Sequence, residues 1–391
     1  MCIVIIGDAF TFPEGTAATN RVHTYAKGFI ENGVNVHVIC FDSRYDTPGD
    51  GISNGIFYYH PFGQGKRNKY LLARSWRKVL KDYKTFRLIT QINKSDKVIA
   101  CICYTKLLRT QFFVFVIAKY IKSKLVLERS EHPLQNYKDY LFTRILGCIK
   151  TFWETKLCNA VLCISQYLID FYKLNGVSSE SLLLVPSTVD TNRFNIVCDP
   201  PLSYSYILYC GSITIIKDGV DILIKSFSKI APVYPQVSLV ILGKGDTIEE
   251  EIIVRGLVDS LNLNDRIFFL GQLPRIEVPP FMLHAKMLVL SRPKSMIADA
   301  GFPSKLTEYL ASGRPIVVTK VGEIEVYLKD NETAFLSIPN SIDAFAERMD
   351  NILSDYESAL RVGEKGKELT LGIFNYNVQA QRMIQFIYKL D

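Results

Sequence analysis

Residues 206–211 read YILYCG, a short apolar run that ends in a glycine. An apolar run of this length, followed by a stretch of helical period, is typical of a buried strand that leads through a turn into a helix. Four similar runs follow, near 238–242, 267–270, 287–290 and 315–319, and stretches of helical period separate them. This alternation predicts a parallel sheet covered by helices.

The same alternation occupies the first half of the chain. Strands are expected at 2–6, 34–40, 98–103, 124–127, 160–164 and 182–185, and the first of them is followed by a helix that Gly33 closes. The sequence DPPLS at 199–203 is interpreted as a linker between the two blocks. The pattern therefore predicts two doubly wound α/β domains, over 1–195 and 203–372, with ligands bound at the carboxyl ends of their strands.

The composition is that of a globular protein. Of the 391 residues, 48% are hydrophobic and 22% are charged, and no apolar run approaches the roughly 18 residues that a membrane span needs. The first residues, MCIVIIGD, lack the basic start of a secretory signal, so we expect a cytoplasmic protein. The nine cysteines include no C-x-x-C pair, which argues against a disulfide framework and against a zinc site.

Positive charge is concentrated at 66–87, which holds nine basic residues and one acid, while the net charge of the whole chain is +7. No aromatic and basic sheet motif accompanies this segment, so nucleic acid is not expected as a partner. The segment has helical spacing. Its apolar face holds Leu72, Trp76, Val79, Leu80 and Tyr83, and the basic residues Arg74, Arg77, Lys78, Lys81 and Lys84 lie largely around the other face. Two interpretations stay open: a helix on an anionic membrane surface, peripheral on the inner face of the cytoplasmic membrane, and a domain helix with a solvated basic face.

Six stretches, in order along the chain, resemble the motifs of one enzyme family. They read PEGTAATNR at 13–21, LVPSTVDTNRF at 184–194, LYCGSITIIKDGVD at 208–221, LVILGKG at 239–245, FLG at 269–271 and GFPSKLTEYLASGRPIVV at 301–318. Together they are similar to the retaining GT-B glycosyltransferases of family 4. The resemblance implies two Rossmann-like domains that face each other across a cleft. It implies that 1–195 bind the acceptor, that 203–372 bind a nucleotide-sugar, and that the C-terminal helix 377–391 joins the first domain.

The resemblance also implies a donor site. Its donor-binding residues are Gly15 and Thr16 in the first motif, Ser212 and Lys217 in the third, and Ser304, Lys305, Leu306 and Glu308 in the last. Glu308 would accept hydrogen bonds from the ribose hydroxyls. His132, just past a predicted strand, would approach the donor sugar and its phosphate, and Asp299 is the second candidate catalytic residue. The implied reaction moves a hexose, with retention, to a glycan or polyprenyl-linked acceptor in polysaccharide biosynthesis.

The chain departs from the family pattern at two positions. Ala300 stands where the family carries its first signature glutamate, and Asp299 is one residue away. Two explanations are open. Asp299 could substitute for the missing glutamate through a shifted loop, or the Pro-Ser-Lys sequence at 303–305 could supply contacts to the donor through backbone amides and Lys305. Ser212 stands where the family often has an arginine, which removes part of the charge that would balance the diphosphate. Lys217 stands where the family motif also has a lysine, and Lys305 is a candidate to replace the missing positive charge.

A departing nucleoside diphosphate needs cations and backbone N–H groups around its phosphates. The predicted helix starts at 16–17 and 304–305 supply N–H groups, and Lys217 supplies a full charge. The chain contains no Asp-x-Asp sequence, the metal clamp of the other large glycosyltransferase class. We therefore expect no metal and no cofactor, and a UDP-sugar or GDP-sugar as the donor substrate.

Structural roles compete with each of these assignments. His132 could cap a loop, Glu308 could be an exposed helix residue, and Lys217 could be a solvated loop charge. Ala300 and Ser212 also motivate a rival function, a non-catalytic GT-B-like partner or nucleotide-binding subunit. A second rival is a sugar-nucleotide epimerase, which would use the same diphosphate contacts without an acceptor. Turnover of a donor separates the three hypotheses.

Overall fold

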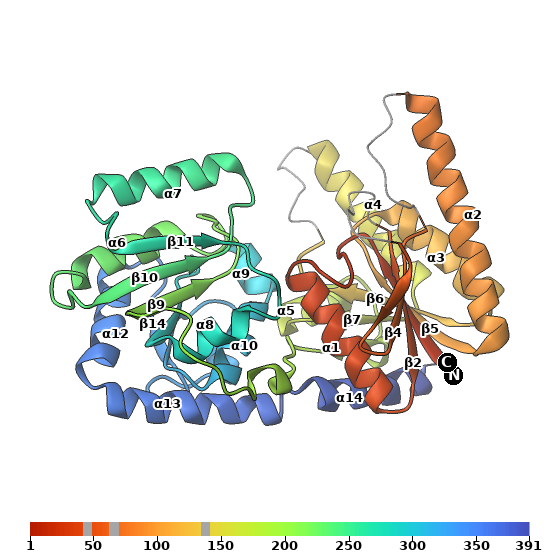
Figure 1. Cartoon of the computed structure of the whole chain (residues 1–391). Coiled ribbons are helices and arrows are strands. Elements are labelled where there is room, and N and C mark those ends of the chain that lie inside the picture. The colour runs from red at the N-terminus through yellow and green to blue at the C-terminus, as the bar shows by residue number, and fades with distance from the viewer. Residues whose placement is uncertain (42–48, 62–69, 134–140, 391) are drawn as a thin grey trace. The chain divides into compact units, whose positions relative to one another are not determined.

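The computed structural model describes residues 1–41, 49–61, 70–133 and 141–390 (Figure 1). The chain forms two compact units, one made of residues 1–186 with 376–391 and the other of residues 187–375. The predicted linker at 199–203 lies inside the second unit. In the part of the chain that the structure describes, no helix is both long and apolar enough to cross a membrane.

The first unit is built on an eight-stranded sheet with the order β3-β4-β2-β1-β5-β6-β7-β8. Its strands are β1 (Cys2–Gly7), β2 (Asn35–Cys40), β3 (Gly51–Ser53), β4 (Ile56–Tyr59), β5 (Val98–Tyr104), β6 (Lys124–Arg129), β7 (Ala160–Cys163) and β8 (Leu182–Leu184). Neighbouring strands are parallel, except for the antiparallel pair β3 and β4. The central strands are buried on both faces, which explains why they appear in the sequence as continuous apolar runs.

The β3–β4 hairpin was not expected from the sequence. Its two turn residues, Asn54 and Gly55, have φ angles of 50° and 78°. Two successive positive φ angles are typical of the tight turns that join two-residue hairpins, where asparagine and glycine are the favoured residues. The hairpin places His60 directly after β4, against the loop that precedes the first helix.

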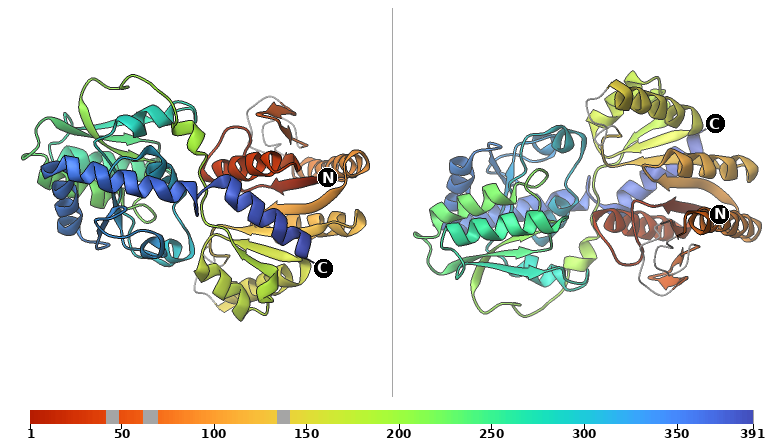
Figure 2. Two further views of the ribbon diagram at one scale, coloured as in Figure 1. Left: turned by 90° about the horizontal axis from the view of Figure 1, so that it is seen from below. Right: turned by 90° about the horizontal axis from the view of Figure 1, so that it is seen from above.

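Helices of the first unit are α1 (Ala17–Glu31), α2 (Leu71–Ser95), α3 (Leu108–Tyr120), α4 (Leu141–Leu157), α5 (Gln166–Leu174) and α14 (Tyr376–Lys389), with a short 3-10 helix η1 (Ser179–Ser181). The last helix, α14, lies beside α1 (Figure 2). A Cβ atom on Gly28 of α1 would lie 2.5 Å from the Cβ of Ala380 in α14, so the two helices approach closely only because position 28 is a glycine. The end of the chain is thereby packed into the first unit.

The second unit is built on a six-stranded parallel sheet with the order β11-β10-β9-β12-β13-β14. Its strands are β9 (Ser205–Cys210), β10 (Val237–Leu242), β11 (Ile267–Gly271), β12 (Met287–Leu290), β13 (Ile316–Thr319) and β14 (Phe335–Ser337). Strand order reverses at β9, because β10 lies on one side of it and β12 on the other. Ligands of doubly wound sheets bind at the carboxyl ends of the strands beside such a switch point.

Helices of the second unit are α6 (Val220–Ile230), α7 (Ile248–Ser260), α8 (Val278–His284), α9 (Met296–Ala300), α10 (Ser304–Ser312), α11 (Ile324–Tyr327), α12 (Ile342–Ser354) and α13 (Tyr356–Glu368). Two short 3-10 helices, η2 (Thr191–Phe194) and η3 (Leu369–Leu371), complete it. The predicted α/β fold class is confirmed, and the predicted strands agree with the observed ones to within two residues.

Candidate functional site

Two glycines terminate the central strands of the second unit. Gly211 follows β9 and Gly243 follows β10, with φ angles of 153° and 145°. A Cβ atom on Gly243 would lie 1.9 Å from the carbonyl oxygen of Gly211, and one on Gly211 would lie 2.3 Å from the ammonium nitrogen of Lys305. Both positions therefore favour glycine, because the φ angles are positive and neighbouring atoms already lie where a Cβ atom would stand.

A cluster of charged side chains lies beside Gly211. The Lys305 ammonium is 2.8 Å from Asp218 Oδ2 and 2.9 Å from the Tyr209 hydroxyl, and Arg292 Nε is 3.9 Å from Asp218 Oδ1. Lys217, next to Asp218 in the chain, is exposed. We call these four charged residues, Lys217, Asp218, Arg292 and Lys305, the cation cluster; they carry three positive charges and one negative charge.

The carboxylate of the cation cluster is ionised. Burial would raise the pKa of Asp218, but the charges of Lys305 and Arg292 outweigh that effect and hold it below its ordinary value. Burial lowers the pKa of Lys305, and the Asp218 carboxylate opposes that shift. Even with Asp218 ionised, the cluster keeps a net positive charge. A net positive charge suits a dianionic phosphate ligand.

The loop between β9 and α6 is held by tyrosine and serine side chains. The Tyr209 hydroxyl donates to the carbonyl oxygen of Ser212 at 2.5 Å, and Ser212 is exposed. At the other end of the loop Gly219 has a φ angle of 66°, and Ser291 Oγ donates to its carbonyl oxygen at 2.7 Å. Arg292 Nε also donates to the carbonyl oxygen of Lys217 at 3.3 Å, so the same arginine fixes the loop that carries the lysine.

Helix α10 contributes the other predicted donor residues. It begins at Ser304, and no side chain caps its N-terminus. Ser304 is half-buried, and Lys305 reaches the cation cluster. The Leu306 side chain is fully buried and its N–H donates to Pro303 at 3.0 Å, so the Leu306 side chain itself faces the core.

Glu308 lies one turn further along α10 and pairs with Arg193 of η2. The Arg193 guanidinium also donates to the carbonyl oxygen of Arg275 at 2.8 Å. Both side chains of the pair are largely shielded, with 13% and 15% of their surfaces exposed. Arg193 and Arg292 were not singled out from the sequence, although Arg193 stands within the motif at 184–194; the contacts of both arginines are long-range.

The structure places Asp299 and Ala300 at the end of the short helix α9. Ala300 is fully buried and Asp299 is half-buried. Successive helical side chains project about 100° apart, so Asp299 points in a different direction from the side chain of residue 300. A carboxylate at 299 can therefore take the place of one at 300 only if the backbone differs locally from that of the family.

Gly15, Thr16 and His132 belong to the first unit. Thr16 is the N-cap residue of α1 and makes no side-chain capping hydrogen bond. A Cβ atom on Gly15 would lie 2.2 Å from Thr19 Oγ1 and 2.3 Å from Thr11 Oγ1, so the loop is too tight for a side chain there. At position 15 the loop therefore presents backbone, whereas the neighbouring Glu14 and Thr16 are exposed.

His132 follows β6 and is buried. Its ring lies edge-on to the rings of Phe171 and Tyr167, with centroids 4.8 Å and 5.8 Å away. Burial lowers the pKa of His132, so its imidazole is neutral near pH 7.

Two acidic residues that precede His132 in the sequence, Glu128 and Glu131, are held in ion pairs. Glu128, at the end of β6, lies 2.7 Å from Arg21 Nε and accepts from the Tyr25 hydroxyl at 3.1 Å. Glu131 pairs with Lys106. Among the described residues, no group of three or more His, Cys, Asp or Glu side chains is placed to hold a metal ion. The metal independence of the reaction stays a prediction.

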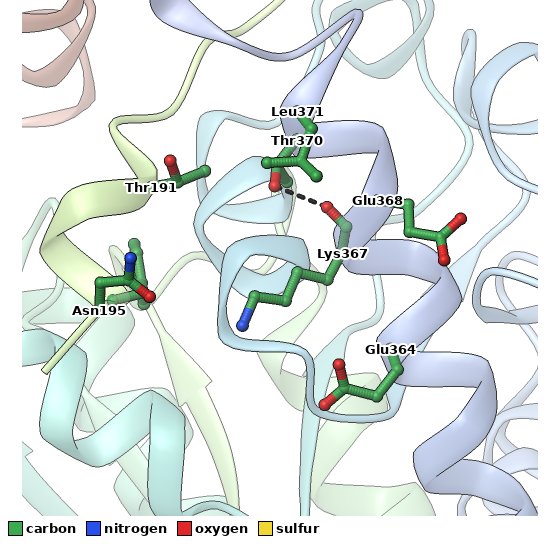
Figure 3. Close-up of a pocket in the computed structure, with 8 residues that line it drawn as sticks. Thr191, Asn195, Glu364, Lys367, Glu368, Thr370 and Leu371 are labelled. Atoms are coloured by element: carbon green, nitrogen blue, oxygen red, sulfur yellow. Dashed lines mark hydrogen bonds between the residues drawn. The ribbon is translucent and has the colours of Figure 1, made fainter. Parts of the chain in front are cut away.

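A separate cavity of about 230 Å³ lies between η2 and α13 (Figure 3). It is lined by Thr191, Phe194, Asn195, Glu364, Lys367, Glu368, Thr370 and Leu371, of which Lys367 carries the positive charge. None of the predicted site residues lines it. The cation cluster therefore remains the candidate site of the second unit.

Comparisons with known proteins find similarity over most of the second unit. Residues 199–369 match the family model described as Glycosyl transferases group 1. A GDP-mannose-dependent alpha-(1-6)-phosphatidylinositol monomannoside mannosyltransferase of Mycobacterium tuberculosis is 24% identical over 242 residues, which are 59% of this chain and 61% of that protein. The chain thus spans less than two thirds of the length of this relative.

Solved structures extend the similarity to the whole chain. Sucrose-phosphate synthase from Thermosynechococcus elongatus superposes with a TM-score of 0.76 at 18% identity and covers 100% of this chain and 99% of its own. The Anabaena protein HepE in complex with UDP superposes with a TM-score of 0.70 at 14% identity, with 100% of both chains covered. The chain has the GT-B fold, and its residues 199–369 are similar to the glycosyl transferases group 1 family, whose motifs it resembles.

Proposed function

We propose that this glycosyltransferase takes its sugar from a UDP-sugar or GDP-sugar and binds the donor's diphosphate at the cation cluster of the second unit. The observation that carries the proposal is the position of the Lys305 ammonium against Gly211, where the absence of a Cβ atom lets it approach the end of β9. A net positive cluster at a sheet switch point suits a diphosphate whose charge grows as the glycosidic bond breaks.

Glu308 is the proposed ribose ligand. A carboxylate accepts hydrogen bonds from two adjacent hydroxyls, and Arg193 holds this one in place from η2. The donor would also contact the loop at Ser212 and the backbone at the start of α10, around Ser304. The relatives support both bases, because HepE was solved with UDP and the mycobacterial enzyme uses GDP-mannose.

The first unit would contribute Gly15, Thr16 and His132. The uncapped start of α1 offers N–H groups to a phosphate, and a neutral imidazole at His132 can donate or accept a hydrogen bond at the sugar. Catalysis in this account consists of positioning and leaving-group stabilisation, and it needs no metal ion. Retention of the anomeric configuration follows from the family.

A thermal-shift screen tests the donor proposal. UDP, GDP, ADP, CMP and their common sugar conjugates are added to the purified full chain in EDTA, because a ligand that binds only the folded protein raises its melting temperature. Stabilisation by UDP or GDP at millimolar concentration is the expected result. No stabilisation by any nucleotide would favour the non-catalytic rival, for which the buried Ala300 is the specific argument.

We further propose that the acceptor is lipid-linked and that the first unit docks on an anionic membrane surface through α2, α3 and α4. These neighbouring helices expose apolar side chains at helical spacing: Trp76, Val79, Leu80 and Tyr83 on α2, Phe112, Val116 and Tyr120 on α3, and Ile145, Ile149, Phe152 and Trp153 on α4. Packed domain helices expose polar residues instead. This arrangement favours the membrane interpretation of 66–87 over a helix with only a solvated basic face.

The charges on these helices have the sign that anionic lipids attract. The three helices hold twelve basic residues and two acids, Asp82 and Glu154. Asp82 pairs with Arg109, and the buried Glu154 lies 3.3 Å from Arg129 and 3.5 Å from Lys150. Apolar side chains among basic ones are typical of surfaces that lie at a membrane interface. The residues at 66–69 lie outside the described part of the chain.

Vesicle cosedimentation tests the membrane proposal. The wild type is expected to bind phosphatidylcholine vesicles that contain phosphatidylglycerol, and binding should weaken with salt. Trp76→Ser with Trp153→Ser should reduce binding, whereas Ile276→Ser, at an exposed residue of the second unit, should not. Equal binding by the double variant and the wild type, or no binding of the wild type to anionic vesicles, would refute the proposal.

A further inference from the structure

Four consecutive backbone carbonyls, at residues 11–14, each accept a hydrogen bond from a side chain. Thr19 Oγ1 donates to Thr11 O at 2.7 Å, and Thr11 Oγ1 donates to Glu14 O at 2.5 Å. Two histidines bind the carbonyls between them. His60 Nε2 lies 3.0 Å from Phe12 O, and His23 Nε2 lies 2.6 Å from Pro13 O.

We propose that His23 and His60 are positioning residues of the donor site, which hold the carbonyl oxygens of the Gly15 loop away from the donor's phosphates. This inference rests on the proposed function, in which the Gly15 loop contacts the diphosphate. The two histidines come from different elements, since His23 lies in α1 and His60 directly follows β4.

The geometry fixes the protonation state of the ring nitrogens that touch the loop. A backbone carbonyl oxygen can only accept a hydrogen bond, so Nε2 of each histidine must carry the proton. Both rings are buried and the Phe12 ring packs against His23, with centroids 4.2 Å apart. Burial lowers the pKa of His60, so the neutral Nε2–H form is present near pH 7.

The direction of a carbonyl sets the direction of the next N–H group. In a trans peptide the C=O and the N–H that follows point to opposite sides. The contact from His23 to Pro13 O therefore directs the N–H of Glu14, and the contact from Thr11 to Glu14 O directs the N–H of Gly15. With these two oxygens bound, the N–H groups of Glu14 and Gly15 point away from them, which is the arrangement that binds phosphate oxygens. The Phe12 carbonyl precedes a proline, which has no N–H, so His60 only holds that oxygen in place.

Without these donors the loop would be a poorer anion site. A carbonyl oxygen carries a partial negative charge, and one turned toward a diphosphate would repel it. Removing a buried donor also leaves its carbonyl without that partner, which favours rotation of the peptide. The expected consequence is weaker binding of the nucleoside diphosphate without loss of the fold.

Titration calorimetry of the full chain with UDP and GDP measures the effect. His23→Phe and His60→Phe are each expected to weaken binding of the nucleotide that the wild type prefers by about tenfold, as loss of one hydrogen bond implies. His23→Gln should bind within about threefold of the wild type, because the glutamine amide nitrogen reaches as far as Nε2 and can donate. His23→Asn, whose amide is shorter by one carbon, should bind as weakly as His23→Phe.

His37→Phe is the matched control. His37 is a third histidine of the first unit and lies in β2, stacked on Phe57 and 3.1 Å from the Tyr59 hydroxyl. The hydrogen bonds described above for the loop at residues 11–14 do not involve it. The His37→Phe variant should bind the nucleotide with the same affinity as the wild type. If His23→Phe does not fold, the comparison of His23→Gln with His23→Asn carries the test, since both are small neutral amides.

The outcomes separate this inference from the function on which it rests. A wild type that binds neither UDP nor GDP refutes the proposed function, and the inference with it. A wild type that binds, together with folded His23 and His60 variants of unchanged affinity, refutes the inference alone. Equal affinity of His23→Gln and His23→Asn, both well below the wild type, would show that ring packing rather than the Nε2 donor matters, and would also overturn it.

Discussion

Replacing Lys305 with methionine should separate the contribution of the cation cluster to stability from its contribution to nucleotide binding. The Lys305 ammonium is 2.8 Å from Asp218, and the side chains are 15% and 5% exposed. Removing one partner of a buried pair leaves an uncompensated charge, which costs roughly 3–5 kcal/mol. Because Arg292 stays 3.9 Å from the same carboxylate, we expect about 3 kcal/mol for Lys305→Met. A loss of that size lowers the Tm of a unit this large by roughly 6–12 °C.

A second substitution tests the cause of that loss. Asp218→Asn in the Lys305→Met background removes the uncompensated carboxylate, so most of the lost stability should return. Nucleotide binding should not return, because the positive charge is still missing. Thermal unfolding and titration with UDP or GDP measure the two quantities on the same samples.

Lys320→Met is the matched control. Lys320 lies in the same unit and pairs at 3.4 Å with the exposed Glu325, so its loss should cost less than about 0.5 kcal/mol. A Tm of Lys305→Met equal to that of the wild type would refute the buried pair. Unchanged nucleotide affinity in both Lys305 variants would refute the role of Lys305 at the donor.

Three further predictions concern the same unit. Lys217→Ala should weaken nucleotide binding about tenfold and leave the Tm unchanged, because the side chain is exposed; calorimetry and thermal unfolding check the two. Arg193→Ala should raise the KM for the donor, because Glu308 loses its ion pair with the Arg193 guanidinium. Arg193→Lys should raise the KM less, and a donor-turnover assay measures both. The pKa of Asp218 lies below its ordinary value, so its contribution to stability is present above that ordinary value and is lost as the pH falls through the lowered pKa. Denaturant unfolding from pH 6 to pH 2 should therefore show a steeper loss for the wild type than for Asp218→Asn.

The two sheets and most of their strands were predictable, because buried parallel strands appear in the sequence as continuous apolar runs. Strand β14, which is only three residues long, was not predicted. The β3–β4 hairpin was missed because its strands are short and partly exposed, so their apolar pattern is weak. Its one clear signal was the pair Asn54 and Gly55, which matches a two-residue hairpin turn.

The orientation of α2 was predicted only in part. Trp76, Val79, Leu80 and Tyr83 do share a face, but that face is exposed. The expectation that Lys81 lies among the solvated basic residues is wrong, because Lys81 is buried with its ammonium 3.8 Å from the centre of the Phe41 ring. Burial lowers the pKa of Lys81 to about 8. Spacing along a helix shows which residues share a face but not what covers that face.

Residues of the candidate site could be proposed where motifs supplied them, and not where side chains meet over long separations in the sequence. Lys217, Lys305 and Glu308 came from family motifs, whereas their partners Arg292 and Arg193 follow only from the folded chain. Arg193 and Glu308 are 115 positions apart, and no local pattern predicts such a pair. The same is true of His60, which lies 48 positions from the Phe12 carbonyl that it contacts.

Calorimetric titration of the full chain with UDP and GDP in EDTA tests the central claim most directly. The account predicts saturable binding of one of the two nucleotides without added metal, weakened by salt and weakened at least tenfold in Lys305→Met with Asp218→Asn. Absence of binding by the folded wild type, or binding that the double variant keeps in full, would contradict a diphosphate site at the cation cluster.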